Sequence, residues 1–108
     1  MTDFSDAISV ATSGMKAQAN RLRHVSENIA NTDTPGYRRK AVTFEEVVNL
    51  GRPTGAVEAG RLRLDQSELK QVFDPAHPLA DDTGYYDGSN VNLLIEIADA
   101  RVAQRSYE

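Results

Sequence analysis

The side chains with the most obvious chemical potential are four aspartates and two histidines. The aspartates gather in one proline- and glycine-rich stretch, at Asp74, Asp81, Asp82 and Asp87. Paired carboxylates can act as acid and base or bind calcium. This stretch lacks the Asp-x-Asp-x-Asp-Gly run with a closing Glu that a calcium loop of the EF-hand type needs. We therefore expect a solvated acidic loop, with no metal site and no bound cofactor.

The sequence also gives no support for nucleophilic catalysis. His24 and His77 have no Ser or Cys partner at a recognisable spacing, the chain contains no cysteine, and it has no Gly-rich phosphate loop. His24 adjoins an apolar stripe, where a histidine is more often structural than a ligand. The sequence therefore predicts a protein that is not an enzyme.

The most regular feature is the apolar stripe itself. Its members recur in alternating steps of four and three residues, interrupted only by Gln18: Phe4, Ile8, Ala11, Met15, Leu22, Val25 and Ile29. This spacing predicts a helix over residues 4–30 with a heptad seam. The helix would be roughly 40 Å long at about 1.5 Å per residue. A compact chain of about 100 residues has a radius of gyration of only about 13 Å, so another helix or another chain must cover the seam.

A sharply specified turn follows this helix. Asn31 is a residue type that can adopt the left-handed conformation that ends a helix. Pro35 and Gly36 stand in the order that a type II turn requires, and Tyr37 follows them. Asn31, Pro35, Gly36 and Tyr37 are therefore predicted to set the direction in which the chain leaves the helix.

Residues 41–88 are predicted to form a small β segment with extended loops. Short strands are expected at residues 41–44, near Val57, at 61–64 and at 69–73. Residues 45–50 either continue the first strand or form a turn of helix. Residues 50–55 contain several breakers and are predicted to be a loop, and residues 74–88 an extended connector.

A second helix is expected in the last segment, residues 89–108. Ser89, Asn90 or Asn92 offers an N-cap, and the apolar face of the helix comprises Val91, Leu94, Ile95, Ala98 and Val102. This face is the expected partner of the first seam. The fold class is thus mainly α: two helices paired in the manner of a coiled coil, with a β hairpin or small β region between them. No C-terminal cap precedes Glu108, so we expect a truncated part of a longer helix.

The charge distribution and the hydropathy limit the classes of partner that the chain can bind. Residues 1–40 carry six basic and four acidic side chains, and residues 41–108 carry six basic and twelve acidic ones. This asymmetry suits head-to-tail stacking of subunits, and the acidic remainder argues against nucleic acid. No apolar run reaches the about 18 residues that a membrane helix needs, and the first residues lack the features of a cleaved signal peptide.

Two segments resemble bacterial flagellar basal-body rod and hook proteins. Residues 28–37, Asn-Ile-Ala-Asn-Thr-Asp-Thr-Pro-Gly-Tyr, are similar to a signature near the N-terminus of that family. Residues 73–85 followed by Asn-Val-Asn at 90–92 resemble the proximal-rod members in particular, as does Arg-Ser-Tyr at 105–107. The resemblance covers both ends of the chain and leaves mainly residues 45–72 unmatched.

The resemblance implies a structural subunit of the flagellar basal body, in the periplasmic rod. In that family the terminal helices pack with other copies and neighbouring rod proteins into a helical tube that transmits torque. Here they would correspond to residues 1–40 and 89–108, with residues 41–88 outside the tube. Family members leave the cytoplasm through the flagellar type III export apparatus without a cleaved signal. Phe4 and Ile8 resemble a short Phe-x-x-x-apolar export motif.

Two other functions remain open on the residues alone. The chain could be a distal-rod or hook-type subunit, or a non-flagellar helical adaptor that closes its seam in a simple dimer. On either rod interpretation, the apolar residues of both helices are the expected partner-binding residues. We also expect residues 4–30 to be poorly ordered in the isolated chain and to gain helix on assembly.

Overall fold

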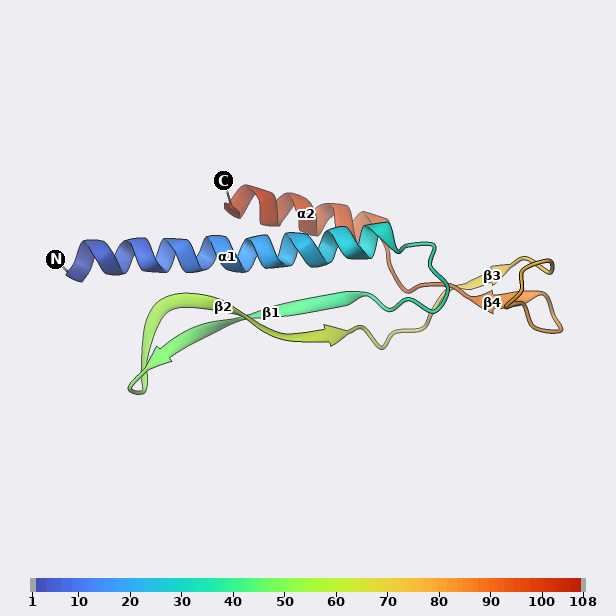
Figure 1. The fold of residues 1–108 in the computed structure, drawn as a ribbon, viewed down its shortest axis with the longest axis horizontal. Helices are drawn as coiled ribbons and strands as arrows, with labels where there is room; N and C mark the ends of the chain where they lie inside the picture. The colour runs from blue at the N-terminus through green and yellow to red at the C-terminus, as the bar shows by residue number, and fades with distance from the viewer. Residues whose placement is uncertain (1, 108) are drawn as a thin grey trace.

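The computed structural model describes residues 2–107 as an elongated molecule of 68 × 28 × 16 Å (Figure 1). Its elements in chain order are α1 (Thr2–Ala30), β1 (Lys40–Asn49), β2 (Arg52–Leu64), β3 (Gln71–Phe73), β4 (Tyr85–Asp87) and α2 (Leu93–Tyr107). The radius of gyration is 18.8 Å, well above the about 13 Å of a compact chain of similar length. The prediction that the first helix outgrows a small globule is confirmed.

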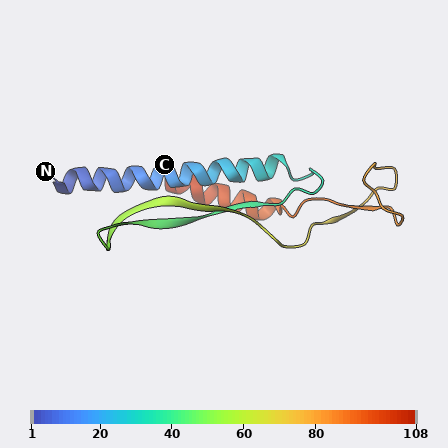
Figure 2. The same cartoon turned by 60° about the horizontal axis from the view of Figure 1, so that its bottom comes forward.

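The two helices lie side by side and run in opposite directions. α2 covers only the C-terminal half of α1, as both views show (Figures 1 and 2). An ion pair between Arg21 of α1 and Asp99 of α2, at 3.1 Å, fixes this alignment. The predicted class, two helices with a small β region between them, is confirmed. The N-terminal half of α1 has no second helix beside it.

α1 does not end in the expected way. Asn31 does not have a positive φ, so the left-handed ending predicted for it is wrong. Instead the Asn31 side-chain amide donates to the carbonyl of Glu27 at 2.8 Å, and the Thr32 hydroxyl donates to the carbonyl of Ile29 at 2.8 Å. These side chains give a second donor to two carbonyls of the last turn, which also accept from the backbone amides of Asn31 and Thr32, at 3.1 and 3.3 Å. α1 therefore ends with side-chain caps and not with a residue in the left-handed conformation.

The next turn has the geometry of type II. The amide of Tyr37 donates to the carbonyl of Thr34 at 3.2 Å, and Gly36 has a φ of +74°. Pro35 supplies the fixed negative φ before it. The amide of Gly36 also donates to the carbonyls of Asp87 and Gly88, at 3.2 and 3.1 Å. The turn thereby joins the end of α1 to the segment that leads into α2.

β1 and β2 form one long antiparallel hairpin, paired from Lys40 with Leu64 to Asn49 with Arg52. Residues 45–49 therefore continue the strand. The loop predicted over 50–55 is confirmed only at residues 50 and 51, because residues 52–55 belong to β2. The tip of the hairpin is a two-residue turn in which Leu50 and Gly51 have φ of 51° and 79°. Positive φ at both positions is characteristic of the type I′ turns that match the twist of a hairpin. Leucine there costs roughly 1–2 kcal/mol, because its Cβ crowds the backbone.

The hairpin packs along α1. The amide of Val57 donates to the hydroxyl of Ser13 at 3.0 Å, and a Cβ built on Gly55 would lie 3.8 Å from the side chain of Val10. A two-stranded hairpin alone is marginally stable in water. Contact with the helix therefore supports β1 and β2, which reach back along α1 toward its N-terminal end (Figure 1).

The segment before α2 corrects two further expectations. Residues 85–87 pair with residues 71–73 as a second short hairpin, so the predicted connector contains a strand. Asn92 is the N-cap, because its side-chain oxygen accepts from the amide of Leu94 at 3.0 Å. Val91 consequently lies before the helix, where it is fully buried, and does not belong to the helical face predicted for it.

Gly36→Val tests the turn. A β-branched residue at φ +74° is strained, so we expect a loss of about 1–3 kcal/mol in the free energy of unfolding. Gly14→Ala in α1 is the control, because no atom lies within 4 Å of the added Cβ and alanine favours a helix by about 1 kcal/mol. Denaturation of the two variants, followed by circular dichroism, measures both effects. A Gly36→Val chain as stable as the original would contradict this role.

Candidate functional site

A single buried asparagine lies where α1, the turn, β1 and α2 meet. Asn28 is fully buried. Its amide nitrogen donates to the carbonyl of Lys40 at 2.9 Å and to Oε1 of Glu96 at 3.0 Å. Its oxygen accepts from the amide of Lys40 and from the hydroxyl of Tyr37, both at 2.8 Å. These four bonds use the full capacity of an asparagine side chain.

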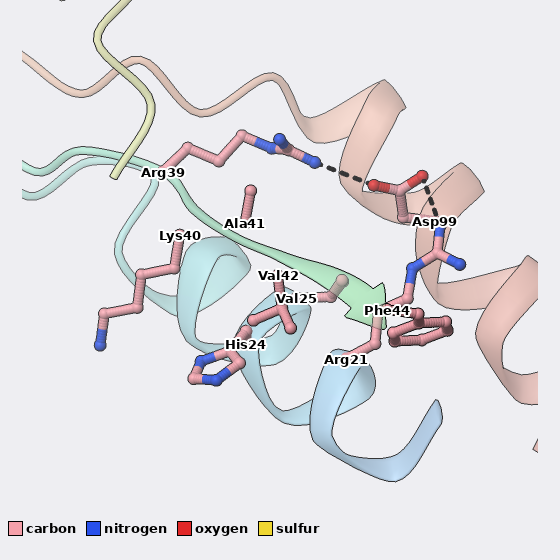
Figure 3. A pocket seen from close by; sticks show the side chains of 9 residues that line it. All are labelled: Arg21, His24, Val25, Arg39, Lys40, Ala41, Val42, Phe44 and Asp99. Atoms are coloured by element: carbon pink, nitrogen blue, oxygen red, sulfur yellow. Dashed lines mark hydrogen bonds and ion pairs between the residues drawn. The ribbon is translucent and has the colours of Figure 1, made fainter. Parts of the chain in front are cut away.

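Charged residues extend this contact toward solvent. Glu96 of α2 is also fully buried and accepts from Nε of Arg39. The same guanidinium reaches Asp99 at 2.9 Å, and Asp99 binds Arg21 of α1 at 3.1 Å (Figure 3). A buried carboxylate is tolerated only when paired and hydrogen-bonded. We call Asn28, Arg39, Glu96, Asp99 and Arg21 the polar hub.

A second asparagine links the loops that meet beside the hub. Asn90 Oδ1 accepts from the amide of Arg39 at 2.6 Å, and its Nδ2 donates to the carbonyl of Asp65 at 2.8 Å. The backbone amide of Asn90 donates to the carbonyl of Tyr37 at 3.3 Å. The hydroxyl of the buried Ser89 donates to the carbonyl of Thr32. The chain entering α2 is thus tied to the turn that leaves α1.

Three side chains beside the hub have shifted pKa values that keep them in the protonation states their contacts require. Burial raises the pKa of Tyr37, so its hydroxyl stays protonated and donates to Asn28. Lys40 Nζ lies 2.6 Å from Oε2 of Glu27. The hydrogen bond between them lowers the pKa of Glu27 and raises the pKa of Lys40, so both groups stay charged.

The hub determines which face of each helix is covered within the chain. On α1 the buried residues are Ala17, His24, Val25 and Asn28. On α2 they are Glu96 and Ala103. Of the predicted seam only Val25 is buried in this way, and Leu22 is half-buried. Because the charges of α2 need partners on α1, the polar side of α2 faces inward.

Most of the predicted partner-binding residues are exposed. On α1 the exposed fractions are 65% for Phe4, 51% for Ile8, 44% for Met15 and 38% for Ile29, and Ala11 is also exposed. On α2, Leu94 is 79% exposed, Ile95 and Val102 are each 51% exposed, and Ala98 is exposed as well. The prediction that these two faces cover each other within one chain is therefore wrong.

The hub was missed by reading apolar spacing alone. Glu96 interrupts the apolar run from Leu93 to Ile97, and a charge at such a position signals a buried partner. Asn28 follows His24 by four residues, one helical turn along the covered face. These two signals exist in the sequence, but neither predicts that Asn28 and Glu96 contact each other.

The aspartate-rich loop has a structural role in this fold. Oδ1 of Asp81 accepts from the amides of Thr83 and Tyr85, at 2.9 and 3.0 Å. Within residues 2–107 no group of three or more His, Cys, Asp or Glu side chains is placed to hold a metal ion. In the same range no helix is both long and apolar enough to cross a membrane.

Comparison with known proteins identifies the family. The family described as flagella basal body rod protein matches residues 8–38, which contain most of α1, Asn28 and the turn. Along its whole length the chain is 44% identical to the flagellar basal-body rod protein FlgC of Agrobacterium fabrum, of which it covers 83%. The chain belongs to the FlgC family of flagellar basal-body rod proteins.

More distant members of the FlgC family agree. FlgC of Salmonella typhimurium is 34% identical over 92% of this chain and 78% of that protein. FlgC of Aquifex aeolicus is 34% identical over the whole chain and 84% of that protein. The resemblance drawn from residues 28–37 and 73–92 is confirmed. Membership makes the chain a structural rod protein of the flagellar basal body, which fits the prediction that it is not an enzyme.

Asn28→Ala tests the hub. Removing the amide takes one hydrogen-bond partner from Glu96, which keeps Arg39, and one each from the Tyr37 hydroxyl and the backbone of Lys40. Each buried group left unsatisfied costs about 1–3 kcal/mol. We expect a loss of several kcal/mol, read as a lower urea midpoint. Asn20→Ala on the same helix, at a half-buried position, should change stability by about 0.5 kcal/mol or less. Equal midpoints for the two variants would contradict the role of Asn28.

Proposed function

We propose that this chain is a subunit of the proximal rod of the flagellar basal body. In this proposal it joins other copies and neighbouring rod proteins through the exposed apolar faces of α1 and α2. The single observation that carries the proposal is the exposure of the predicted seam, with Phe4 65% and Ile8 51% exposed. Contiguous exposed apolar surface of this kind marks an interaction site.

The energetics favour coverage by other chains. Burying a large apolar side chain contributes about 1.5–3 kcal/mol relative to leaving it exposed. Phe4 and Ile8 belong to the first two turns of α1, in the N-terminal half of the helix that α2 does not reach (Figure 1). Met15 continues the same stripe and is 44% exposed. Their heptad spacing matches the holes that a facing helix offers. We propose that helices of neighbouring subunits fill this side in a coiled-coil-like wall.

The same proposal assigns roles to the rest of the chain. Residues 1–40 and 89–108 form the wall, and residues 41–88 lie outside it. The hub fastens the helices to one another, so a torque applied to one subunit is passed on without sliding of α1 against α2. The chain reaches the periplasm through the flagellar type III apparatus, to which the N-terminal residues around Phe4 and Ile8 are presented.

Met15→Asp tests this function, at a seam position outside the export motif of Phe4 and Ile8. The side chain is 44% exposed in the single chain, so the aspartate costs little there, but in the wall it becomes a buried unpaired charge. We expect normal secretion, loss of the chain from purified basal bodies and loss of motility. Ser9→Asp is the control, because position 9 is exposed and lies off the seam.

Two outcomes would contradict the proposal. One is normal motility of the Met15→Asp strain with the variant present in its basal bodies. The other is a pair of results: the purified chain sediments as a discrete dimer that Met15→Asp abolishes, and basal bodies purified from cells with the original chain do not contain it. That second result would favour a helical adaptor that closes its seam in a dimer.

A further inference from the structure

Residues 71–88, here called the end hairpin, form a structured unit that projects from one end of the molecule (Figure 1). Within residues 2–107, β3 and β4 contact each other and no other helix or strand. The ring centroids of Phe73 and Tyr85 lie 5.0 Å apart, and the rings of His77 and Tyr86 stack at 4.0 Å. A segment held in place by its own contacts loses little conformational entropy when it binds. The end hairpin is therefore preformed for a partner outside its own chain.

The end hairpin exposes apolar and acidic side chains together. Phe73 and Leu79 are each 61% exposed. Its charged side chains are four exposed aspartates, and it contains no Glu, Lys or Arg: Asp74, Asp81, Asp82 and Asp87. In the part of the chain that the structure describes, the acidic members of the ion pairs are Glu27, Glu96 and Asp99. The four negative charges of the end hairpin are thus not neutralised by its own chain, and the complementary surface is one that is apolar and basic.

The side of α2 that faces away from α1 has both properties. Leu94, Ala98, Arg101 and Arg105 follow one another in steps of four, three and four residues, which places them on one face of the helix. Glu96, which is buried against α1, lies on the other side. Leu94 is 79% exposed, and the other three are exposed as well. We call these four residues the outward face of α2.

The two arginines of the outward face are also without acidic partners. The ion pairs of the described residues use Arg21, His24, Arg39 and Lys40 as their basic members, and neither Arg101 nor Arg105. The outward face therefore has a charge of +2, against a charge of −4 on the end hairpin. Complementary charges steer association and select one partner over others.

The uncovered N-terminal half of α1 fits the end hairpin less well. Its stripe is apolar, but the charged residues of positions 2–16 are Asp3, Asp6 and Lys16, with a net charge of −1. Like charges that face each other across an interface oppose binding. Charge therefore favours α2 over this part of α1 as the partner of the end hairpin.

The end hairpin and the outward face of one chain point apart. The end hairpin and α2 extend in opposite directions from the segment that joins them (Figure 1). Arg105 lies a further about 18 Å along α2 from Leu93, at about 1.5 Å per residue. A contact between the two surfaces therefore joins two molecules. Because it uses different surfaces of each copy, it repeats from copy to copy and builds a ring or an open helical array.

We propose that the end hairpin of one copy docks on the outward face of α2 of a second copy. Phe73 and Leu79 supply apolar contact to Leu94, and the aspartates lie opposite Arg101 and Arg105. This inference rests on the proposed function and deepens it, because it names what meets one side of α2 and gives a role to a segment outside the wall of helices.

A photo-cross-linker tests the contact directly. Leu79 is replaced by p-benzoylphenylalanine in a strain that makes only this variant, and purified basal bodies are irradiated. We expect a cross-linked dimer of this chain in which the second site maps to residues 93–105. A chain that enters basal bodies but forms no such dimer would overturn the inference and leave the proposed function standing. A second site within residues 2–16 would overturn the choice of α2, and a cross-link to a different rod protein would overturn the second copy.

Neutral variants give an independent test. Arg101→Gln together with Arg105→Gln removes the positive charge of the outward face, so we expect severalfold less chain in purified basal bodies. Asp74→Asn together with Asp82→Asn should also lower the amount. All four changes together should lower it no further than the arginine pair alone, because the aspartates then have no charge to attract.

The matched control is Arg61→Gln together with Arg63→Gln, two exposed arginines of β2. This variant removes the same charge outside the contact and should leave the amount of chain unchanged. Asparagine at position 74 keeps the side-chain oxygen that accepts from the amide of Ala76, so the fold of the end hairpin is preserved. Equal losses from the two arginine pairs, or a further loss in the fourfold variant, would overturn the inference.

Discussion

The arrangement of this chain depends on the complete satisfaction of one buried amide. Asn28 makes four hydrogen bonds, to β1, to the turn and to α2. A buried polar group that loses a partner costs far more than one bond contributes when made. The end of α1, the turn and the start of β1 follow one another in the chain, and α2 reaches them from 68 residues away at Glu96. These segments must therefore come together for the amide to be satisfied. The side chain of Asn90 acts in a similar way. It links the backbone of Arg39, just before β1, to the backbone of Asp65, just after β2.

Because of this constraint, polar groups are buried between the two helices and large apolar residues are exposed. The contact between α1 and α2 is made by paired charges and small residues, including Glu96 and Ala103. The large apolar residues of both helices are left on the outside, where Ile8 is 51% and Leu94 79% exposed. A chain built to fold alone would place them inward. In the proposed rod, neighbouring subunits would cover these residues, and the hub holds the two helices in the orientation that exposes them.

The sequence predicted the elements better than their partners. The heptad rhythm from Phe4 to Ile29 indicated a long helix correctly, and Pro35-Gly36 indicated the turn, because both signals are local. Apolar spacing says that a face must be covered but not what covers it, which is why the two seams were wrongly paired. The ending at Asn31 failed because a side-chain cap and a left-handed residue use the same amino acid. The hairpin tip was missed because leucine is a poor residue for a type I′ turn.

The most direct measurement of the central claim is the reactivity of a cysteine placed in the seam. Met15→Cys adds the only thiol to a chain that has none, at a position 44% exposed in the single molecule. The account predicts rapid reaction with a polar thiol reagent in the isolated chain and strong protection in purified basal bodies. Protection already present in the monomer, or equal reactivity in the assembled rod, would contradict the account.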